Sequence, residues 1–518
     1  MLRAARVLGI LAACYAVFIL AMRLAFPLPE RPEATAPGIA PVRVETGLGE
    51  ILAPLAAAHP GGSGIATLNS GSDAFAARIH LARSATVSIE AQYYIWHDDL
   101  TGIRLLTELQ AAAERGVHVR LLVDDNGTPS LDQELAALDA LPTAEVRIFN
   151  PFTLRDHRLI NYAFDFYRMN RRMHNKSFTV DGIVTIVGGR NIGDIYFETG
   201  GALNYVDLDV MAVGPAAAAV SADFARYWTS LSAYPASSLI TPSPGAATRL
   251  EQRDAALRDT AQGRSYAAYV HDSSFVEDLL NATLRLEWVP ARLFSDDPDK
   301  VLGLDDDGDL MIRRLFAEIG HPEHSLDVVS AYFIPGASAT AQLVDFAADG
   351  VRVRVLTNAL EATDVVAVHG AYASYRSTLV AGGVEVHELR SEGSERRTVR
   401  ELEFLDQSSA AIHAKSFSVD RRRAFIGSLN FDPRSRRLNT EMGLLIDSTL
   451  IAGGISDRLD ENLPTLAYRV SLDADQRMIW TGQDRDGQVA VFDVEPNTTL
   501  PLRLLVGFIG LLPVQWLL

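Results

Sequence analysis

Hydrophobic and polar positions follow the same pattern in two parts of the chain. In each part, a strand-like segment of alternating β-branched and aromatic residues comes first. An alanine-rich segment with helical character follows, and then a glycine and a second, more continuously apolar strand. The copies lie at 87–95, 105–114 and 115–122 in the first half and at 326–334, 341–348 and 349–356 in the second. Strand–helix–strand order in each half predicts two α/β lobes.

The spacing between the two copies is nearly constant. The first strands are 239 residues apart and the glycine-led strands are 234 residues apart. The histidines of a short motif described below, His174 and His413, are again 239 residues apart. Such an offset indicates an internal duplication.

Both ends of the chain are apolar. Val7–Met22 is an uninterrupted run of 16 apolar residues, and a helix that spans a bilayer needs about 20. Residues 11–14 also fit the cleavage box of a lipoprotein, with Cys14 as the lipidated residue, but the apolar stretch continues beyond it. An uncleaved anchor is therefore favoured. Arg3 and Arg6 favour a cytoplasmic N-terminus, with the body on the outer side of the membrane.

The C-terminal stretch 502–518 is apolar but too short to cross a bilayer, and Pro513 interrupts it. We expect a segment that lies at the membrane interface with Trp516 at headgroup level, and a terminal helix packed on the core is the alternative. The predicted organisation is an anchor or leader (1–28), a Pro-, Ala- and Gly-rich linker (29–64), two lobes (65–270 and 271–465) and a C-terminal extension (466–518).

Composition narrows the class of protein. The chain has 518 residues, of which 48% are hydrophobic and 22% charged, values typical of globular domains with sizeable cores. A net charge of −18 argues against non-specific binding to nucleic acid and against simple electrostatic adhesion to an anionic membrane. Cys14 is the only cysteine, which excludes an internal disulfide.

The strongest chemical signal is a repeated motif, His-x-Lys-x4-Asp. Its members are His174, Lys176 and Asp181 in the first half and His413, Lys415 and Asp420 in the second. Only three of the 47 Lys and Arg residues are lysines, and two of those three lie in these motifs. Because a lysine ammonium is compact and an arginine guanidinium is a wide planar fork, this choice points to a tight anion site.

Each motif is predicted to lie on a β-hairpin. The first would run from 174 to 180, turn at Asp181 and return over 183–187, and the second would run over 412–419 and 424–426. Residues i and i+2 of a strand project to the same side, so His and Lys of each motif face one ligand. Asp181 and Asp420, placed at the turns, are expected to be structural.

Polar residues follow each hairpin at matched positions. The returning strands end in GGRN and GSLN, which place Gly189 and Asn191 in the first half and Ser428 and Asn430 in the second. Glycine allows close backbone approach, and an asparagine amide can donate to an anion. Carboxylates come next, Asp207 or Asp209 in the first half and Glu441 in the second. Each could accept a hydrogen bond from a histidine Nδ1–H and so present Nε2.

Together these residues predict one phosphate site. Lysines and asparagines would hold its oxygens, one histidine would attack phosphorus, and the other would protonate the leaving alcohol. The lysines supply the positive charge, so we expect neither a metal ion nor a cofactor. The residues alone do not say which histidine is the nucleophile.

The motifs resemble those of the phospholipase D superfamily, whose signature is the paired His-x-Lys-x4-Asp. The segments NRRMHNKSFTVDG, LTNALEATDVVAVHGAYASYR and IGSLNFDPRSRRLNTE are most similar to its bacterial cardiolipin-synthase-like branch. The resemblance implies two α/β lobes with the site at their interface and a phosphohistidine intermediate. It assigns the nucleophile to His174, the general acid to His413, phosphate binding to Lys176, Lys415, Asn191 and Asn430, and orientation of the histidines to Asp207 and Glu441.

The apolar ends favour a lipid phosphodiester, and the resemblance favours transfer of a phosphatidyl group to phosphatidylglycerol at the bacterial inner membrane. Phosphatidylglycerol or another glycerophospholipid would be the substrate, and nucleic acid would not be a partner. Arginines near the motifs, Arg172, Arg190 and Arg434, are predicted to attract the anionic headgroups. A hydrolytic phospholipase D, a nuclease and a membrane-tethered scaffold are the alternatives. The phosphatidyl donor and the involvement of an accessory protein stay open.

Overall fold

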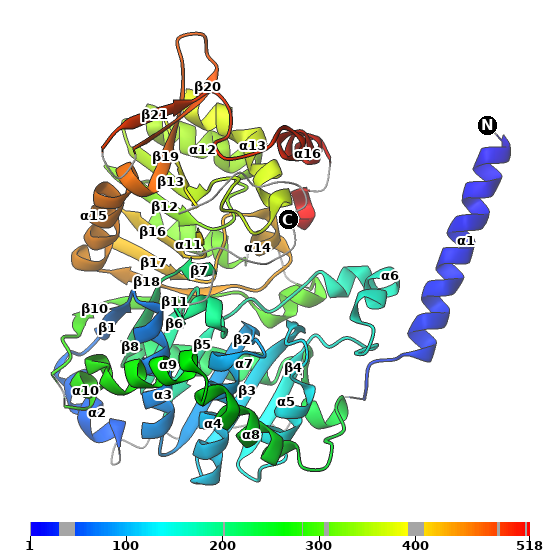
Figure 1. The fold of residues 1–518 in the computed structure, drawn as a ribbon, viewed down its shortest axis with the longest axis vertical. Coiled ribbons are helices and arrows are strands. Elements are labelled where there is room, and N and C mark those ends of the chain that lie inside the picture. Colours follow the sequence, from blue (N-terminus) through cyan, green and yellow to red (C-terminus); the bar gives the residue numbers. More distant parts are fainter. Residues whose placement is uncertain are drawn as a thin grey trace.

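The protein consists of two α/β lobes stacked along its long axis (Figure 1). The structure is a computed structural model and describes residues 2–30, 47–199, 203–281, 283–304, 310–391, 409–483, 487–512 and 515–518. Each lobe is built on one large mixed sheet flanked by helices. The predicted duplicated α/β architecture is confirmed.

The sheet of the first lobe has nine strands. Their order across the sheet is β10 (Glu287–Val289), β1 (Ser63–Leu68), β8 (Asp209–Val213), β6 (Val184–Gly188), β5 (Ser177–Val180), β2 (Ser88–Ile95), β3 (His118–Gly127), β4 (Ala144–Phe149) and β9 (Ala233–Pro235). Strands β2, β3 and β4 are parallel, and their neighbours are antiparallel.

The sheet of the second lobe has ten strands. Their order is β11 (Ala291–Ser295), β18 (Met442–Asp447), β17 (Arg423–Gly427), β16 (Lys415–Val419), β12 (Ser325–Ser330), β13 (Arg352–Asn358), β14 (Glu385–Leu389), β19 (Ala467–Leu472), β20 (Met478–Gln483) and β21 (Val489–Phe492). Strands β12, β13 and β14 are parallel. From β1 to β9 and from β11 to β19 the two sheets therefore repeat one strand order, as the duplication predicts.

Helices cover both sheets because the parallel strands bury both of their faces. In β3, Leu121 and Val123 belong to the same core as Leu105 and Leu109 of α4, whereas Leu122 on the other face belongs to a cluster with Phe224 and Trp228. The helices are α1 (Leu2–Ala25), α2 (Leu48–Ala58), α3 (Gly71–Ser84), α4 (Leu100–Glu114), α5 (Asp132–Asp139), α6 (Arg158–Met169), α7 (Pro215–Trp228), α8 (Ala246–Arg258), α9 (Ala261–Asp272), α10 (Ser274–Leu280), α11 (Met311–Ile319), α12 (Gly336–Ala348), α13 (Val366–Ala381), α14 (Pro433–Arg437), α15 (Thr449–Leu466) and α16 (Leu500–Gly510).

The structure corrects three predicted boundaries. The expected linker 29–64 contains α2, whose Leu48 and Leu52 are buried in the first core, while residues 31–46 lie outside the described residues. The first sheet continues to β10, so the lobes meet near residue 290 rather than 270. The expected extension after 465 supplies β19, β20 and β21 to the second sheet. Strand β19 occupies the place that β9 has in the first sheet, whereas β20 and β21 have no counterpart there, so the repeat could not reveal these two.

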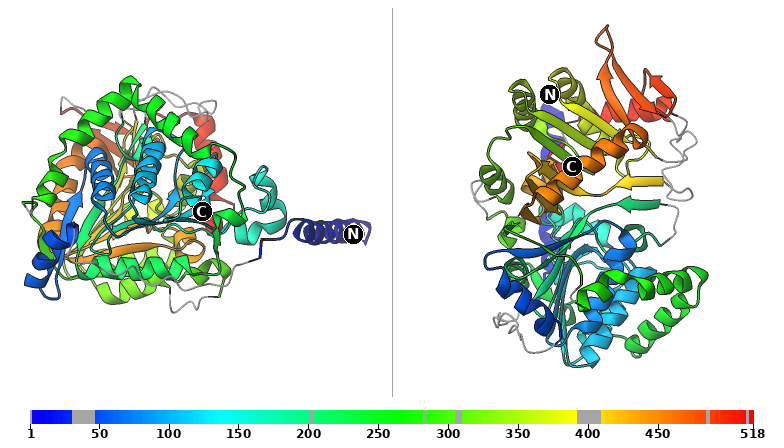
Figure 2. Two further views of the ribbon diagram at one scale, coloured as in Figure 1. Left: turned by 90° about the horizontal axis from the view of Figure 1, so that it is seen from below. Right: turned by 90° about the vertical axis from the view of Figure 1, so that its left-hand side faces the viewer.

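The apolar ends lie on the same side of the molecule (Figures 1 and 2). In α1, the segment Arg6–Ala25 is long and apolar enough to cross a membrane and is not buried against the body. Helix α16 buries Leu502 and Val506 against the second lobe but exposes Leu504 and Phe508. The helix thus packs on the core, as the alternative prediction proposed, and keeps an apolar outer face.

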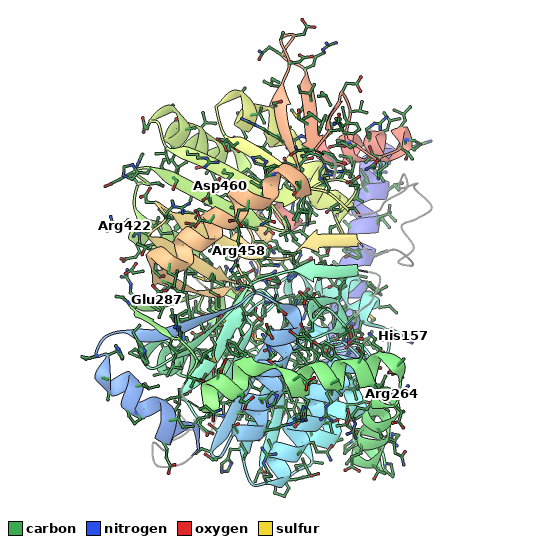
Figure 3. All side chains as sticks on the ribbon, turned by 60° about the vertical axis from the view of Figure 1, so that its left-hand side comes forward. His157, Arg264, Glu287, Arg422, Arg458 and Asp460 are labelled. Carbon is green, nitrogen blue, oxygen red and sulfur yellow. The ribbon has the colours of Figure 1, made fainter. Side chains whose placement is uncertain are left out.

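The lobes also touch away from the strands that carry the motifs. The Ser448 hydroxyl of the second lobe donates to Glu287 of β10 at 2.6 Å, and the Arg458 guanidinium donates to Asn69 of the first lobe. Glu287 and Arg458 lie along the boundary between the two lobes (Figure 3). These contacts help to fix the relative position of the two half-sites.

Candidate active site

The first motif lies where the two lobes meet. His174 and Lys176 precede β5, which begins at Ser177, so the predicted strand 174–180 is shorter than expected. The backbone N–H of His174 donates instead to the carbonyl of Thr440 in the second lobe, at 2.9 Å. Met173 forms a parallel bridge with the same Thr440. The other lobe therefore positions the backbone of this motif.

The second motif is held in the same manner. His413 lies between β15 (Ser409–Ile412) and β16, and its backbone N–H donates to the carbonyl of Val206 at 2.9 Å. Strand β15 pairs in parallel with β7 (Leu203–Val206) of the first lobe. Each histidine is thus attached to the opposite lobe through its own main chain.

The carboxylates that bind the histidines are exchanged between the lobes. The Nδ1 atom of His174 lies 2.8 Å from Oε2 of Glu441, and Nδ1 of His413 lies 2.6 Å from Oδ2 of Asp207. A carboxylate in its ionised form only accepts hydrogen bonds, so Nδ1 then carries the proton and Nε2 is the ring nitrogen left to react. The sequence indicated these carboxylates but not the exchange.

Each lysine reaches back to its own motif. The ammonium of Lys176 donates to the carbonyl of His174 at 2.6 Å, and that of Lys415 donates to the carbonyl of His413. Burial lowers the pKa of Lys176 well below its usual value and lowers that of Lys415 to about 8. Two ammonium groups lie in one buried site, and an anionic ligand would offset the repulsion between them.

Both histidines are neutral at pH 7. Burial lowers the pKa of His174 well below 6.5, and the nearby Lys176 and Lys415 lower it further. Burial and Lys415 also lower the pKa of His413 to about 4, against the opposing effect of Asp207. The two motifs lie close together, because His174 contacts Glu441 of the second half and His413 contacts Asp207 of the first.

The two carboxylates differ in their ionisation. Burial raises the pKa of Glu441 to about 7, and Lys176 only partly offsets this effect. Burial also acts on Asp207, but His413 and Lys415 outweigh it and lower the pKa of Asp207 to about 2. The Oε1 atom of Glu441 is buried and accepts no hydrogen bond from the described residues, which fits its raised pKa.

Gly189 and Ser428 support these carboxylates from matched positions. A methyl group at Gly189 would lie 2.1 Å from Oδ1 of Asp207, so this carboxylate needs glycine beneath it. At the equivalent place the Ser428 hydroxyl donates to Oε2 of Glu441 at 2.5 Å. Both residues thus contact the carboxylates, a role that the sequence did not indicate.

The two asparagines are not equivalent. Asn191 accepts from the backbone N–H of Ile95 at 3.1 Å and donates to the Tyr196 hydroxyl at 3.1 Å, so its amide forms part of the wall of the site. The Oδ1 atom of Asn430 is buried and has no partner among the described residues. The amide of Asn430 is therefore less firmly held than that of Asn191, and its Nδ2 group is the one that would donate to a phosphate oxygen.

Tyrosines around the histidines were missed by the sequence analysis. The ring of Tyr94 lies edge-on to His174, with centroids 5.0 Å apart, and the Lys176 ammonium lies 5.6 Å from the same ring. Tyr196 and Tyr205 lie 5.1 and 5.0 Å from the ring of His413. The available signal was the paired tyrosines at the end of the strand 87–95, where parallel strands place functional residues.

The third lysine also belongs to the support of the site. Lys300 is buried and donates to Asp296 at 2.7 Å, and the same carboxylate oxygen accepts the backbone N–H of Glu441 at 3.0 Å. Lys300 therefore acts on Glu441 through Asp296. In the sequence, the only indication of a role for Lys300 was that lysine is rare in this chain.

Two of the three predicted substrate-binding arginines are internal supports instead. Arg172 is fully buried and donates to the carboxylate of Asp124 and to main-chain carbonyls. Arg190 is also buried and donates to four carbonyls, among them that of Asp207 at 2.6 Å. The prediction was wrong for both, because their donors are already used. Arg434 donates to the carbonyls of Asn170 and Leu517 and keeps no carboxylate within ion-pair distance in the described structure.

The aspartates of the motifs close the hairpins. Asp181 has a positive φ of 52° and accepts from the backbone N–H groups of Thr86, Val87 and Ser88. Asp420 has the same φ and accepts from the backbone of residues 323–325. Each aspartate therefore ties its turn to the start of the neighbouring parallel strand.

We expect Asp181→Ala to lower the free energy of unfolding by about 1–3 kcal/mol, because the buried N–H of Ser88 and the partly buried N–H groups of Thr86 and Val87 would lose their acceptor. Turnover per folded molecule should stay near that of the parent protein well below the unfolding temperature. Thermal unfolding and turnover of the same sample provide the measurement. Asp420→Ala is the matched control, with a smaller loss, because its site is only partly buried. A selective loss of turnover without destabilisation would contradict the structural role.

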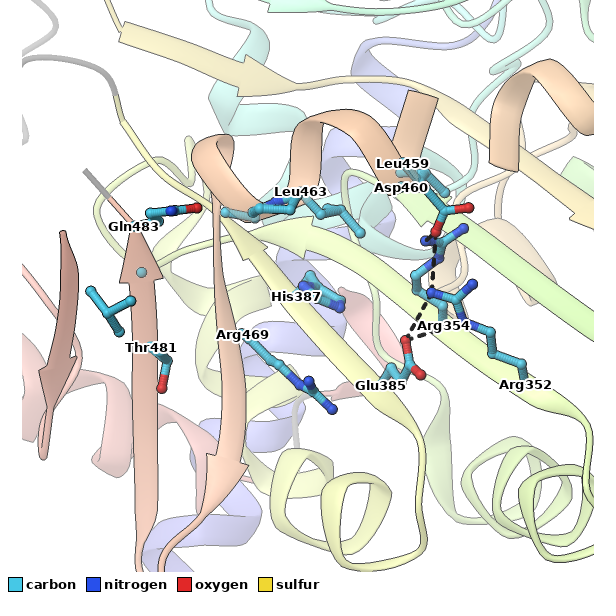
Figure 4. Close-up of a pocket in the computed structure, with 14 residues that line it drawn as sticks. Arg352, Arg354, Glu385, His387, Leu459, Asp460, Leu463, Arg469, Thr481 and Gln483 are labelled. Atoms are coloured by element: carbon cyan, nitrogen blue, oxygen red, sulfur yellow. Dashed lines mark hydrogen bonds and ion pairs between the residues drawn. The ribbon is translucent and has the colours of Figure 1, made fainter. Parts of the chain in front are cut away.

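A cavity of about 430 Å³ lies elsewhere, in the second lobe between α15 and strands β13, β14, β19 and β20 (Figure 4). Its walls include Arg352 and Arg354, but both already pair with Asp460, and Arg352 also pairs with Glu385. The histidine–lysine site is therefore the better candidate for chemistry.

Comparisons with known proteins agree with this geometry. The family model described as cardiolipin synthase, PLD-like domain, matches residues 78–228 and 315–463. The chain is 43% identical over 471 residues to cardiolipin synthase C of Escherichia coli strain K12, covering 91% of this chain and 99% of that protein. An uncharacterized protein of Helicobacter pylori strain 26695 is 30% identical over 480 residues, covering 90% and 92%. The crystal structure of phosphatidylserine synthase from Haemophilus influenzae Rd KW20 has a similar fold, with a TM-score of 0.54 at 14% identity, covering 88% of this chain and 95% of that one.

Proposed function

Because the chain belongs to the cardiolipin synthase family with phospholipase D-like domains and is a phosphatidyltransferase of that type, we propose that it forms cardiolipin through a phosphohistidine. A phosphatidyl group would pass from one phospholipid to His174 and then to the hydroxyl of phosphatidylglycerol. The observation that carries the proposal is the exchanged pairing of His174 with Glu441 and of His413 with Asp207. This pairing leaves two Nε2 atoms and two ammonium groups for one phosphate.

In the first step, Nε2 of His174 attacks phosphorus and the bond from phosphorus to the headgroup oxygen breaks. Nε2–H of His413 gives its proton to the departing alcohol. Asp207, with its low pKa, is ionised at neutral pH and stabilises the imidazolium that this role requires. The anionic substrate itself favours protonation of His413, because it offsets the positive charge of the lysines.

In the second step, the acceptor hydroxyl gives its proton to Nε2 of His413. Its oxygen then forms a bond to phosphorus, and the bond from phosphorus to His174 breaks. With two molecules of phosphatidylglycerol, the products are cardiolipin and glycerol. Lys176 and Lys415, with Asn430, would hold the phosphate oxygens as charge develops on them.

The membrane association of the family fits the apolar helix α1. We propose that α1 anchors the protein in the bacterial inner membrane with its body on the outer side, as the arginines before the span favour. Phospholipids of that membrane would then be both donor and acceptor.

The decisive test supplies the purified full chain with phosphatidylglycerol labelled in its acyl chains. Cardiolipin is the expected product. Phosphatidic acid alone would show a hydrolytic phospholipase D, in which water takes the place of the acceptor. Cleavage of DNA without lipid turnover would instead show a nuclease, which the net charge of −18 disfavours.

A further inference from the structure

Helix α6 has an outer apolar face that the catalytic scheme does not use. Leu159 is 84% exposed and Tyr167 is 68% exposed, and Ile160 and Phe166 are exposed on the same helix. The inner side of α6 is different, because Asn161 and Phe164 are buried there. Two of these residues precede a kink of α6 at Asp165 and two follow it, and four large exposed apolar residues in so short a segment are more than scattered surface residues would explain.

The helix leads directly into the active site. It ends at Met169, five residues before His174. The Tyr162 hydroxyl of α6 donates to Asn126 at 3.2 Å, and Asn126 donates to the Tyr94 hydroxyl at 3.1 Å. The Tyr94 ring in turn packs against His174. A ligand held along α6 would therefore have its polar end close to the nucleophile.

The candidate membrane span contacts the same helix. The Tyr15 hydroxyl of α1 donates to the carbonyl of Ala163 at 2.6 Å, and Arg23 pairs with Asp165 at 3.0 Å. Figures 1 and 2 show α1 and α6 on one side of the body, with α16 on the same side. Helix α16 exposes Phe508, and Trp516 near the C-terminus is 49% exposed.

Cations lie at the base of this surface. The Arg171 guanidinium stacks on the Tyr167 ring at 4.9 Å and has no carboxylate partner among the described residues. Arg434 joins the end of α6 to the C-terminus through the carbonyls of Asn170 and Leu517. Apolar residues outside, and beneath them two arginines that have no carboxylate partner in the described part of the chain, match the order of acyl chains and phosphates in a lipid leaflet.

We propose that the outer face of α6, together with α16 and Trp516, docks on the lipid bilayer and passes a phospholipid headgroup to His174 while the acyl chains stay in the leaflet. The proposal rests on the proposed function only in that the substrate is a phospholipid. Arg171 and Arg434 would receive the phosphate on its way to the lysines. Helix α1 then tethers the protein, and α6 is the part that loads substrate.

The position of α6 can be measured in the full chain with Cys14, the only cysteine, replaced by serine. A polarity-sensitive dye is attached at Leu159→Cys, and the protein is reconstituted in vesicles of phosphatidylethanolamine and phosphatidylglycerol with brominated acyl chains. We expect a blue-shifted emission that the bromines quench. Leu450→Cys on α15 is the matched control, because Leu450 is 71% exposed on another face, and its dye should stay in water. A blue shift without quenching would show that a second copy of the chain covers α6 and would overturn the proposal.

The function of α6 is tested with Leu159→Ser combined with Ile160→Ser. Turnover of phospholipid in vesicles should fall about tenfold or more, because two apolar side chains leave the leaflet. Turnover of a dihexanoyl phospholipid dissolved as monomers should stay within about twofold, which also shows that the variant is folded. Equal turnover on vesicles by variant and parent protein would overturn the proposal. Release of the donor headgroup is the readout, so the comparison holds even if water, not phosphatidylglycerol, proves to be the acceptor.

Discussion

Replacing His174 with alanine is expected to abolish both turnover and covalent capture of phosphorus, whereas replacing His413 should slow turnover but leave the capture intact. The difference follows from the two roles. Without Nε2 of His174 no bond to phosphorus can form. Without His413, the bond from His174 to phosphorus still forms when the leaving group needs no proton. The intermediate then persists, because no base activates the acceptor hydroxyl.

The measurement uses a phosphatidyl ester of p-nitrophenol, labelled at phosphorus. His413→Ala should release one equivalent of p-nitrophenol in a burst and retain label in an acid-labile, base-stable form, with steady turnover about 10²–10⁴-fold below the parent protein. His174→Ala should show neither burst nor label. His118→Ala, at an exposed histidine of β3, is the control and should behave as the parent protein. Label on His174→Ala, and none on His413→Ala, would reverse the two roles.

The duplication was readable from the sequence because the core strands and motifs recur at nearly fixed offsets. The edge strands β10, β20 and β21 were not, because nothing in the repeat specifies a strand that only one lobe has. The same limit explains the linker, where Leu48 and Leu52 pack on the first core without any repeated pattern.

The site residues were predicted by type, but not how they are joined. Spacing along the chain placed Glu441 with the second motif, whereas contact places it on His174 of the first. Arg172 and Arg190 illustrate the opposite error. Both flank motif residues in sequence, but an arginine that binds buried carbonyls has the same spacing as one that faces substrate. Only the folded structure distinguishes an arginine that supports the interior from one that faces substrate.

The exchanged carboxylates should have opposite effects on stability when they are neutralised. The pKa of Glu441, about 7, is above its ordinary value of 4.5, so the fold favours the protonated acid. This stabilisation is fully present below pH 4.5 and is lost as the pH rises through 7. The pKa of Asp207, about 2, is below its ordinary value of 3.8, so the fold favours the carboxylate. That stabilisation is present above pH 3.8 and is lost as the pH falls through 2.

Glu441→Gln should therefore raise the free energy of unfolding at pH 8 by about 2–3 kcal/mol and change it little at pH 4, because glutamine has no charge to bury. Asp207→Asn should lower it by about 2 kcal/mol at both pH values, because His413 and Lys415 lose their partner. Thermal unfolding of both variants at the two pH values provides the comparison. Equal destabilisation by both variants at pH 8 would contradict the difference in their ionisation.

Activity should respond in the same direction in both variants, with a loss of about 10²–10⁴-fold, because neither amide accepts the Nδ1–H as a carboxylate does. The parent protein should also gain kcat/KM as the pH rises through about 7. Only ionised Glu441 accepts from Nδ1 of His174 and leaves a lone pair on Nε2, whereas protonated Glu441 favours the tautomer that cannot attack. Glu441→Gln should lose this rise while becoming more stable. A variant that is more stable but less active would show that the buried charge of Glu441 serves phosphoryl transfer and lowers the free energy of unfolding.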